Sequence, residues 1–192
     1  MPIIIDNISK SFGECKIVDK FSLTLPENNV VCLWGKSGSG KTTIMNMVAG
    51  IIKPDKGKII GIEDKKISYV FQENRLIPWL SAKENVKLAI DSKYKDEEAL
   101  FWLEKLMLGE VADKKPCSLS GGMQRRVSIA RALAHKADVL LLDEPFTGLD
   151  MQTKNVVMNI IKDMTKSTII LLITHNYYEA KFLSKTICTI GE

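Results

Sequence analysis

The chain has 192 residues, of which 45% are hydrophobic and 26% are charged, and its formal net charge is +4. This length favours one domain with a full hydrophobic core, and the composition is that of a globular protein rather than a disordered one. The basic residues are spread along the sequence, so the charge gives little support to nucleic-acid binding, and we expect no nucleic-acid partner.

The four cysteines lie far apart and form no C-x-x-C pair, which argues against a structural zinc site. They are Cys15, Cys32, Cys117 and Cys188. We expect reduced thiols, as in a cytosolic protein. Residues 1–6 have no basic region and no long apolar stretch, so we expect no signal peptide. The longest clean apolar run, residues 169–173, is far shorter than the roughly 20 residues that a membrane span needs. We therefore expect a soluble chain that reaches a membrane only through a partner.

The first third of the sequence is predicted to contain short strands, turns and one helix. The predicted strands are residues 3–5, 16–18, 21–25, 30–34 and 67–71. The run 21–25 alternates with a period of two, whereas 30–34 is apolar throughout, as in a buried strand. A helix is predicted from Lys41 to about Ala49, ending at Gly50.

Residues of about 73 to 135 are predicted to form a helical block. Ser81 followed by Glu84 is a capping-box signature. Asp96 is the predicted cap of a second helix, and a third begins near Ser120. The predicted apolar face of the second helix consists of Ala99, Leu100, Leu103, Leu106 and Met107, and that of the third includes Val127, Ala130, Leu133 and Ala134.

The last third alternates buried strands with helices. Residues 139–142 and 168–173 are strands by composition, and an amphipathic helix over 152–165 lies between them. A short helix and a last strand over 186–190 follow. This alternation implies an α/β fold with a parallel sheet covered on both faces.

Residues 35–42 match the phosphate-binding pattern G-x-x-x-x-G-K-[ST] at every fixed position, between a predicted strand and a predicted helix. Glycines let backbone N–H groups surround phosphate oxygens, and the helix N-terminus adds positive potential. Lys41 supplies a charge for the β- and γ-phosphates, and the Thr42 hydroxyl is placed to bind Mg²⁺. The candidate nucleotide-binding residues here are Gly35, Lys36, Ser37, Gly38, Ser39, Gly40, Lys41, Thr42 and Thr43. The competing interpretation is a chance glycine-rich loop.

Asp143 and Glu144 end a predicted buried strand. Ligands collect at the carboxyl ends of the strands in a parallel sheet, so we expect both carboxylates beside the phosphate-binding loop. Asp143 is the candidate Mg²⁺ partner, and Glu144 is the candidate general base. The competing interpretation is a helix cap or turn acid.

A second glycine-rich element, Leu-Ser-Gly-Gly-Met at residues 119–123, opens a predicted helix far downstream. Two phosphate-binding elements in one small domain suggest a nucleotide held from both sides, and therefore a partner chain. The alternative is a capped helix start without a ligand.

Together these motifs resemble the ATP-binding cassette (ABC) ATPases, with residues 119–123 as the family's signature. Other family marks follow in the expected order: Phe12 at the adenine-stacking position, Gln72 in the Q-loop, Gly148, Leu149 and Asp150 in the D-loop, and His175 as the switch histidine. The resemblance covers essentially the whole chain. Phe12 can alternatively cover the core, and His175 can be an ordinary histidine at a strand end.

The resemblance implies an α/β P-loop NTPase fold with a parallel-sheet core, a small N-terminal antiparallel β subdomain and an inserted helical subdomain. In a single ABC ATPase domain over 1–192, the RecA-like core comprises about 1–72 and 136–192, and the helical subdomain comprises about 73–135. The implied ligands are ATP and Mg²⁺, with Thr42, Gln72 and Asp143 at the metal. Glu144, Gln72 and His175 are the implied catalytic residues.

The family mechanism implies that two cassettes meet head to tail, as a homodimer. Each ATP then lies between the phosphate-binding loop of one copy and the signature of the other. Ser120, Gly121 and Gly122 would grip the γ-phosphate of the partner's nucleotide, and Asp150 would lie at the same junction.

The sequence departs from the family pattern at three positions. Met123 and Arg125 stand where glutamine is frequent, and Asn176 follows His175 where an acid is common, which predicts altered local contacts. The sequence also ends soon after its last predicted strand, so the C-terminal helices of many cassettes are not in it. We expect either a minimal cassette or a shortened chain.

Residues 75–80, followed by Glu84-Asn85-Val86, resemble the cassettes of nitrate, sulfonate and taurine-type importers. In such importers this stretch forms a groove for a coupling helix, so Trp79 and Leu80 are candidate docking residues. The alternative places both in the core of the helical block. The implied partners are transmembrane permease subunits and an extracytoplasmic substrate-binding protein. The implied location is the cytoplasmic face of the membrane, and the implied cargo is a small anionic or organic solute.

Two other classes compete with a transport ATPase. Soluble non-transport ABC ATPases usually carry long coiled coils or a second cassette, and neither occurs in this sequence. GTPases and kinases with a similar phosphate-binding loop have no use for residues 119–123, and no N-K-x-D guanine motif occurs.

Overall fold

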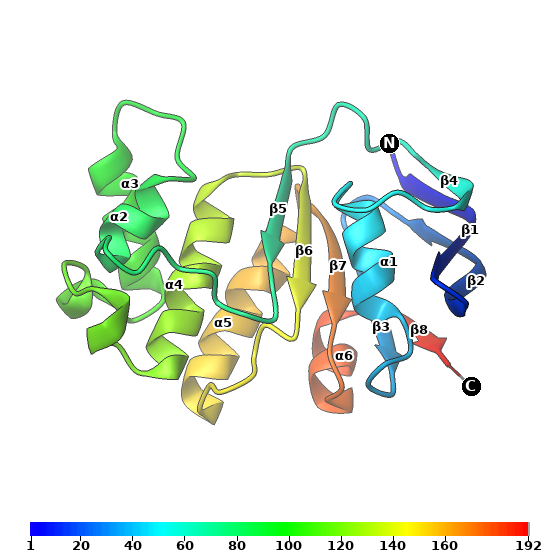
Figure 1. Ribbon diagram of the computed structural model, residues 1–192. Helices are drawn as coiled ribbons and strands as arrows, with labels where there is room; N and C mark the ends of the chain where they lie inside the picture. The colour runs from blue at the N-terminus through cyan, green and yellow to red at the C-terminus, as the bar shows by residue number, and fades with distance from the viewer. Residues whose placement is uncertain (192) are drawn as a thin grey trace.

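Two sheets form the framework of the computed structural model, which describes residues 1–191 (Figure 1). The smaller sheet is antiparallel, in the order β2-β1-β4, and the larger sheet is parallel, in the order β5-β6-β7-β3-β8. The antiparallel strands are β1 (Ile3–Phe12), β2 (Cys15–Leu25) and β4 (Lys56–Ile60). The parallel strands are β3 (Val30–Gly35), β5 (Ile67–Val70), β6 (Val139–Asp143), β7 (Ile169–Ile173) and β8 (Thr186–Ile190).

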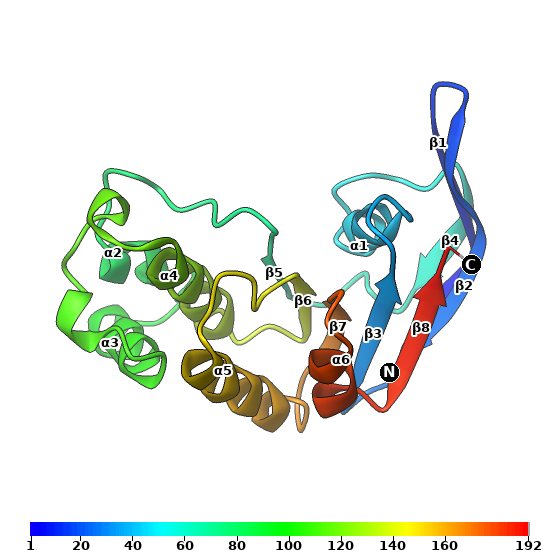
Figure 2. The ribbon, with the colours of Figure 1, turned by 90° about the horizontal axis from the view of Figure 1, so that it is seen from below.

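Helices cover both faces of the parallel sheet, and a helical block lies beside it (Figure 2). The helices are α1 (Lys41–Val48), α2 (Ala82–Lys87), α3 (Lys95–Lys105), α4 (Gly121–Ala134), α5 (Met151–Met164) and α6 (Tyr177–Leu183), with 3₁₀ turns at Gly109–Val111 and Pro116–Ser118. Helices α2, α3 and α4 form the block. The structure therefore has the predicted α/β architecture of an antiparallel N-terminal sheet, a parallel core sheet and a helical subdomain. Across residues 1–191, no helix is long and apolar enough to cross a membrane.

The two faces of the parallel sheet belong to two separate hydrophobic cores. On strand β6, Val139 and Leu141 face a core shared with α1 and the antiparallel sheet, whereas Leu140 and Leu142 face a core shared with α5, α6 and the helical block. Successive side chains of a strand point to opposite faces, so a strand buried on both sides must be apolar at every position. This explains why the composition alone located β3, β6 and β7.

The N-terminal strands are longer than the sequence predicted. Strands β1 and β2 form one long hairpin whose pairing has several register shifts. Many residues of both strands face solvent and are polar, and a register shift interrupts the alternation on which a strand prediction depends. The short apolar runs therefore marked only part of each strand.

The prediction that Asp96 caps the second helix is wrong. Helix α3 begins at Lys95 with Tyr94 at the N-cap position and no side-chain cap hydrogen bond. The Asp96 carboxylate instead forms an ion pair with Lys87 of α2, in which Oδ2 of Asp96 lies 2.8 Å from Nζ of Lys87. It lies in the first turn of α3, where a negative charge is favourable without capping.

The predicted apolar face of this helix is also partly wrong. Ala99 and Leu103 are buried, but Leu100 is partly exposed, and α3 ends at Lys105, before the last two members of the set. Leu106 still reaches the core from the chain just after the helix. Met107 has a φ of +59° and its side chain is exposed, because the chain turns away from the helix axis there.

Candidate nucleotide-binding site

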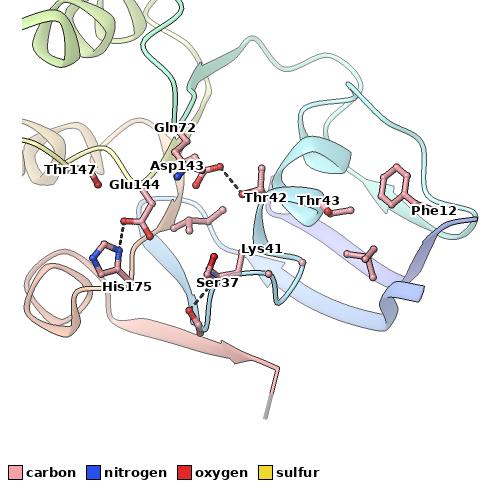
Figure 3. Close-up of a pocket in the computed structure, with 15 residues that line it drawn as sticks. Phe12, Ser37, Lys41, Thr42, Thr43, Gln72, Asp143, Glu144, Thr147 and His175 are labelled. Carbon is pink, nitrogen blue, oxygen red and sulfur yellow. Dashed lines mark hydrogen bonds and ion pairs between the residues drawn. The ribbon is translucent and has the colours of Figure 1, made fainter. Parts of the chain in front are cut away.

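Three adjacent parallel strands, β3, β7 and β6, end at one edge of the sheet and deliver the predicted functional residues there. In the register of these strands, Leu33 and Asp143 both lie opposite Ile173. A cavity of about 530 Å³ opens at this edge (Figure 3). Its lining residues are Phe12, Ile17, Gly35, Ser37, Gly38, Gly40, Lys41, Thr42, Thr43, Gln72, Asp143, Glu144, Thr147, Ile173 and His175. The volume suits a small-molecule ligand.

The loop between β3 and α1 needs glycine at two positions for different reasons. Gly40, the N-cap of α1, has a φ of +87°, and a Cβ there would lie 2.9 Å from the carbonyl oxygen of Ile17. Gly38 has a φ of +81°, but no atom lies within 4 Å of its Cβ position. The backbone at Gly38 is therefore open toward the cavity, which suits close approach by a phosphate.

Lys41, the first residue of α1, is buried and folds back over the loop. Its Nζ donates hydrogen bonds to the carbonyl oxygens of Gly35 at 2.9 Å and Lys36 at 2.6 Å. A weaker contact joins Nζ to Ser39 Oγ at 3.3 Å. The cation thus lies within the phosphate-binding loop itself, satisfied by acceptors that an anion in the cavity can replace.

Thr42 and Asp143 meet at the carboxyl edge although 101 residues separate them. Thr42 Oγ1 donates a hydrogen bond of 2.9 Å to Asp143 Oδ2. Asp143 is only 2% exposed, and this burial raises the pKa of its carboxyl group, while the hydrogen bond from Thr42 opposes the rise.

A hydroxyl and a carboxylate are hard oxygen ligands of the kind Mg²⁺ prefers, and this ion commonly completes its shell with substrate phosphates and water. Within residues 1–191 no cluster of three or more His, Cys, Asp or Glu residues could hold a metal ion. The donors at Thr42 and Asp143 therefore fit a metal that binds together with a nucleotide, rather than one held by protein ligands alone.

Glu144 follows Asp143 in an unusual backbone conformation, with a φ of +48°. Its Oε2 lies 2.9 Å from Nδ1 of His175, which comes from the end of β7. Burial raises the pKa of the Glu144 carboxyl group, and the contact with His175 counteracts part of that rise. The glutamate side chain is mostly buried, whereas the His175 ring is largely exposed to the cavity mouth.

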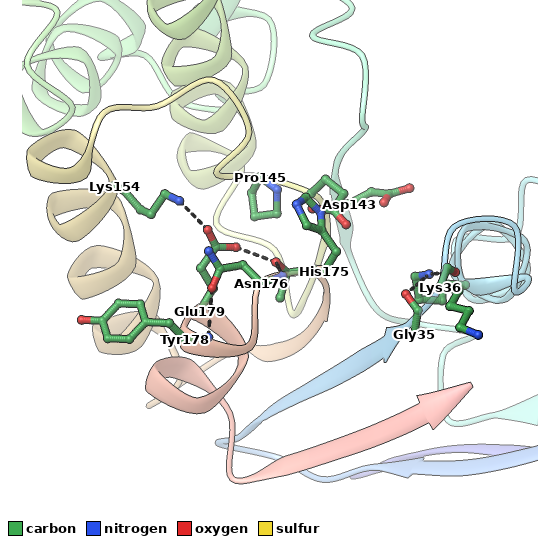
Figure 4. A network of polar contacts seen from close by, with 12 residues as sticks. Gly35, Lys36, Asp143, Pro145, Lys154, His175, Asn176, Tyr178 and Glu179 are labelled. Atoms are coloured by element: carbon green, nitrogen blue, oxygen red, sulfur yellow. Dashed lines mark hydrogen bonds and ion pairs between the residues drawn. The ribbon is translucent and has the colours of Figure 1, made fainter. Parts of the chain in front are cut away.

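The segment that carries His175 rests on a buried ion pair (Figure 4). Glu179 of α6 accepts hydrogen bonds from Lys154 Nζ of α5 at 2.6 Å and from Thr174 Oγ1 at 2.5 Å. The Asn176 backbone N–H donates to Thr174 Oγ1 at 3.1 Å, and the Asn176 side chain caps α6. His175 therefore lies between Thr174 and Asn176, two residues that hydrogen bonds to each other and to α6 hold in place.

The other predicted residues divide into two groups by location. Phe12, 53% exposed at the end of β1, lines the cavity together with Thr43 and Gln72. Ile17 and Thr147 also line it, and no sequence motif marked either residue. Lys36 and Ser39 belong to the loop but not to the cavity lining.

The second glycine-rich element does not belong to this cavity. Ser120 caps α4 by accepting a 3.3 Å hydrogen bond from the backbone N–H of Met123. Gly122 packs against the carbonyl oxygen of Gly148, so the signature and the predicted D-loop are neighbours. Asp150 also lies outside the cavity lining, and its carboxylate caps α5 through the N–H and hydroxyl of Thr153.

A strand, a glycine-rich loop and a helix, with two acids at the end of a parallel strand that one further strand separates from the first, define a P-loop nucleoside triphosphatase. The family model described as ABC transporter matches residues 18–147 of this chain. The chain therefore belongs to the ABC transporter family, as an ATP-binding cassette whose ATP hydrolysis is coupled to transport.

Curated relatives match nearly the whole chain. A probable sulfate/thiosulfate import ATP-binding protein of Chlorella vulgaris is 37% identical over 97% of this chain and 86% of its own length. An aliphatic sulfonates import ATP-binding protein of Pseudomonas syringae pv. tomato is 34% identical, over 100% and 74%. A bicarbonate transport ATP-binding protein of Synechocystis sp. is 38% identical, over 95% and 71%.

Solved structures of dimeric ABC cassettes share the fold. One, a post-hydrolysis state bound to ADP and Pi, has a TM-score of 0.89 and 31% identity, covering 98% of this chain and 94% of the other. Another, the dimer of a bacterial ABC transporter cassette, has a TM-score of 0.90 with the same identity and coverage.

We predict that Lys41→Ala weakens ATP binding by about tenfold or more, because a charge-assisted bond to phosphate typically contributes 1.5–3 kcal/mol. Lys53→Ala is the matched control and should leave the affinity unchanged, because Lys53 is exposed and lies outside both the phosphate-binding loop and the cavity lining. Titration with a fluorescent ATP analogue measures both affinities. Equal affinities for Lys41→Ala and the wild type would contradict the assignment of this loop.

Proposed function

We propose that this chain is the ATP-hydrolysing subunit of an importer for small anionic or organic solutes. One observation carries the proposal. One cavity is lined by Lys41, Asp143, Glu144 and His175, while the second glycine-rich element, residues 119–123, lies outside it. Such an arrangement suits a nucleotide that binds to one copy and is enclosed by another.

In this proposal the loop of residues 35–43 holds the ATP phosphates. Its backbone N–H groups and Lys41 Nζ bind phosphate oxygens, and the Phe12 ring stacks on the adenine. Thr42 Oγ1, Asp143 and the Gln72 side chain hold Mg²⁺, which supplies charge neutralisation for the phosphates when bound. The Thr42–Asp143 contact supports this assignment because it brings two oxygen ligands together at the loop.

Glu144 is the proposed general base. Its carboxylate accepts a proton from water as the water oxygen bonds to the γ-phosphorus and the bond to the β–γ bridging oxygen breaks, which releases ADP and phosphate. A carboxylate with a raised pKa is a better proton acceptor at neutral pH than an exposed one. His175 orients Glu144 and donates to the γ-phosphate, which its exposed ring can reach from the cavity mouth.

Ser120, Gly121 and Gly122 are proposed to close the nucleotide site of a second copy. Their place at the N-terminus of α4 gives them N–H donors and a favourable dipole for an anion. Gly121 has no atom within 4 Å of its Cβ position, so this chain itself leaves the space in front of it open. Asp150 and the chain around Gly148 lie beside this element and would belong to the same junction.

The proposed permease contact is the loop around Trp79, whose side chain is 70% exposed. Leu80 is half-buried. The loop is rigid because Asn85, fully buried, accepts from the N–H of Ile77 and donates to the carbonyls of Ile77, Leu80 and Ser81. A large exposed apolar side chain on a fixed loop is typical of a protein-binding surface.

The solute class rests on the relatives. Their names refer to the import or transport of sulfate, thiosulfate, aliphatic sulfonates and bicarbonate, which are small anions. An importer of this class works with permease subunits and an extracytoplasmic substrate-binding protein, so we place the chain at the cytoplasmic face of the membrane. We also propose the division into a RecA-like core, about 1–72 and 136–192, and a helical subdomain, about 73–135.

We predict that Glu144→Gln reduces steady-state ATP turnover by about 100-fold or more while ATP affinity changes little, because the amide cannot accept the proton. Glu104→Gln, at an exposed position of α3, is the charge-matched control. Phosphate release and analogue binding give the two readouts. Turnover near the wild-type rate in Glu144→Gln would show that another group is the base.

We predict that a membrane-embedded subunit co-purifies with the tagged chain from detergent-solubilised source membranes, and that Trp79→Ser reduces its recovery. Phe101→Ser removes another exposed aromatic of the helical block and serves as the control. ATP turnover of each isolated chain should stay unchanged. Recovery of no membrane protein by the wild-type chain would favour a soluble ATPase, and equal recovery by both variants would refute the Trp79 surface.

A further inference from the structure

We propose that Arg125 is a positioning residue of the ATPase reaction. Its guanidinium group fixes the backbone that carries Glu144 and, at the same time, the backbone that carries Gln72. The inference rests on the proposed function, in which both side chains act at the nucleotide. Arg125 itself does not line the cavity.

Arg125 comes from the second turn of α4 and is only 3% exposed. All five of its N–H donors reach main-chain carbonyl oxygens. Nη2 donates to Asp143 at 2.7 Å and to Glu144 at 2.6 Å, and Nε donates to Pro145 at 3.1 Å. Nη1 donates to Phe71 and, at 3.2 Å, to Gln72.

The accepting carbonyls lie where two strands of the sheet end. Residues 71 and 72 follow β5, and residues 143–145 span the end of β6, so strand pairing no longer supplies donors to all of these oxygens. A buried carbonyl without a donor is unfavourable. The guanidinium group carries five donors in one rigid plane, and no other side chain can satisfy this many acceptors from one position.

The Arg125 guanidinium group binds residues 143–145, where the backbone conformation is unfavourable. Glu144 has a φ of +48°, a region that few non-glycine residues occupy because it is sterically unfavourable for them. Arg125 holds the carbonyls of Glu144 and both its neighbours, while the Glu144 N–H donates to the carbonyl of Ile173 at 3.0 Å. The backbone is thus held on both sides, and the direction of the Glu144 side chain follows from it.

The other arginines of α4 lack this arrangement. Arg126 donates to the carbonyls of Leu106 and Met107, inside the helical block. Arg131 donates to those of Asn74 and Arg75, beyond Gln72 in the chain. Only Arg125 joins the segment of Gln72 to the segment of Glu144, and it does so from the helix that begins at the signature.

The test compares ATP turnover and ATP affinity in Arg125→Gln, Arg125→Lys and the wild type, with Arg126→Gln as the matched control. We expect kcat to fall about 10-fold to 100-fold in both Arg125 variants, because displacement of a reacting group by about 1 Å has effects of this size. ATP affinity should change by less than about threefold, since the phosphate-binding loop is untouched. Lys cannot replace the fork, because its three donors radiate from one atom.

The same substitution in a Glu144→Gln background separates positioning from general stability. Because Arg125 acts through Glu144 as well as through Gln72, Arg125→Gln should lower the residual single-turnover rate of Glu144→Gln by a smaller factor than it lowers the kcat of the wild-type chain. Arg126→Gln should lower the melting temperature without lowering kcat. If Arg125→Gln does not fold, Arg125→Lys is measured in both backgrounds instead.

Three results would overturn the inference: wild-type kcat in Arg125→Gln, full recovery of kcat in Arg125→Lys, or an equal loss in both backgrounds. Failure of the proposed function is a different result. It would be near-wild-type turnover in the Glu144→Gln single variant, which is measured independently of any substitution at Arg125.

Discussion

Parallel pairing of β6, β7 and β3 is the constraint on which the site depends. All three strands run in one direction, so the loop after β3, the acids after β6 and the histidine after β7 arrive at one edge of the sheet. A shift of one residue in any of these pairings would move each apolar side chain into the opposite core, where its shape does not match its neighbours, and would also change which residues meet at the edge. The contact between Thr42 and Asp143 follows from that register rather than from any local preference.

Burial then sets the chemistry of this edge. Asp143 and Glu144 lose much of their contact with water, and the pKa of each carboxyl group rises as a result. Lys41 lies across the same cavity with only neutral acceptors around its Nζ. In the proposed function, this cavity offers Lys41 to the phosphates, Thr42 and Asp143 to a metal ion, and Glu144 as the proton acceptor. The signature lies outside the lining of this cavity, so in the proposed function a second copy completes the site.

The sequence located those parts of the structure whose cause is local. The phosphate-binding loop, the capping box at Ser81 and the strands buried on both faces each follow from residues close together in the chain. Apart from the expected approach of Asp143 and Glu144 to the phosphate-binding loop, interactions across the fold were not predicted. Asp96 pairs with Lys87 instead of capping its helix, Thr147 reaches the cavity by virtue of the turn after β6, and Arg125 stood out only as a departure from a family pattern. Its five acceptors come from two segments that are 18 or more residues away and converge only in the folded chain.

The claim that the signature closes a site on another copy is tested most directly by the oligomeric state with ATP. Glu144→Gln and the double variant Glu144→Gln/Gly121→Val are compared by sedimentation with Mg²⁺ and ATP. The valine has open space in its own chain, so folding and ATP affinity should persist, but it would meet the nucleotide of the partner. We expect an ATP-dependent dimer for the single variant and a monomer for the double variant. ATP-dependent dimers of both, with equal stability, would contradict the claim.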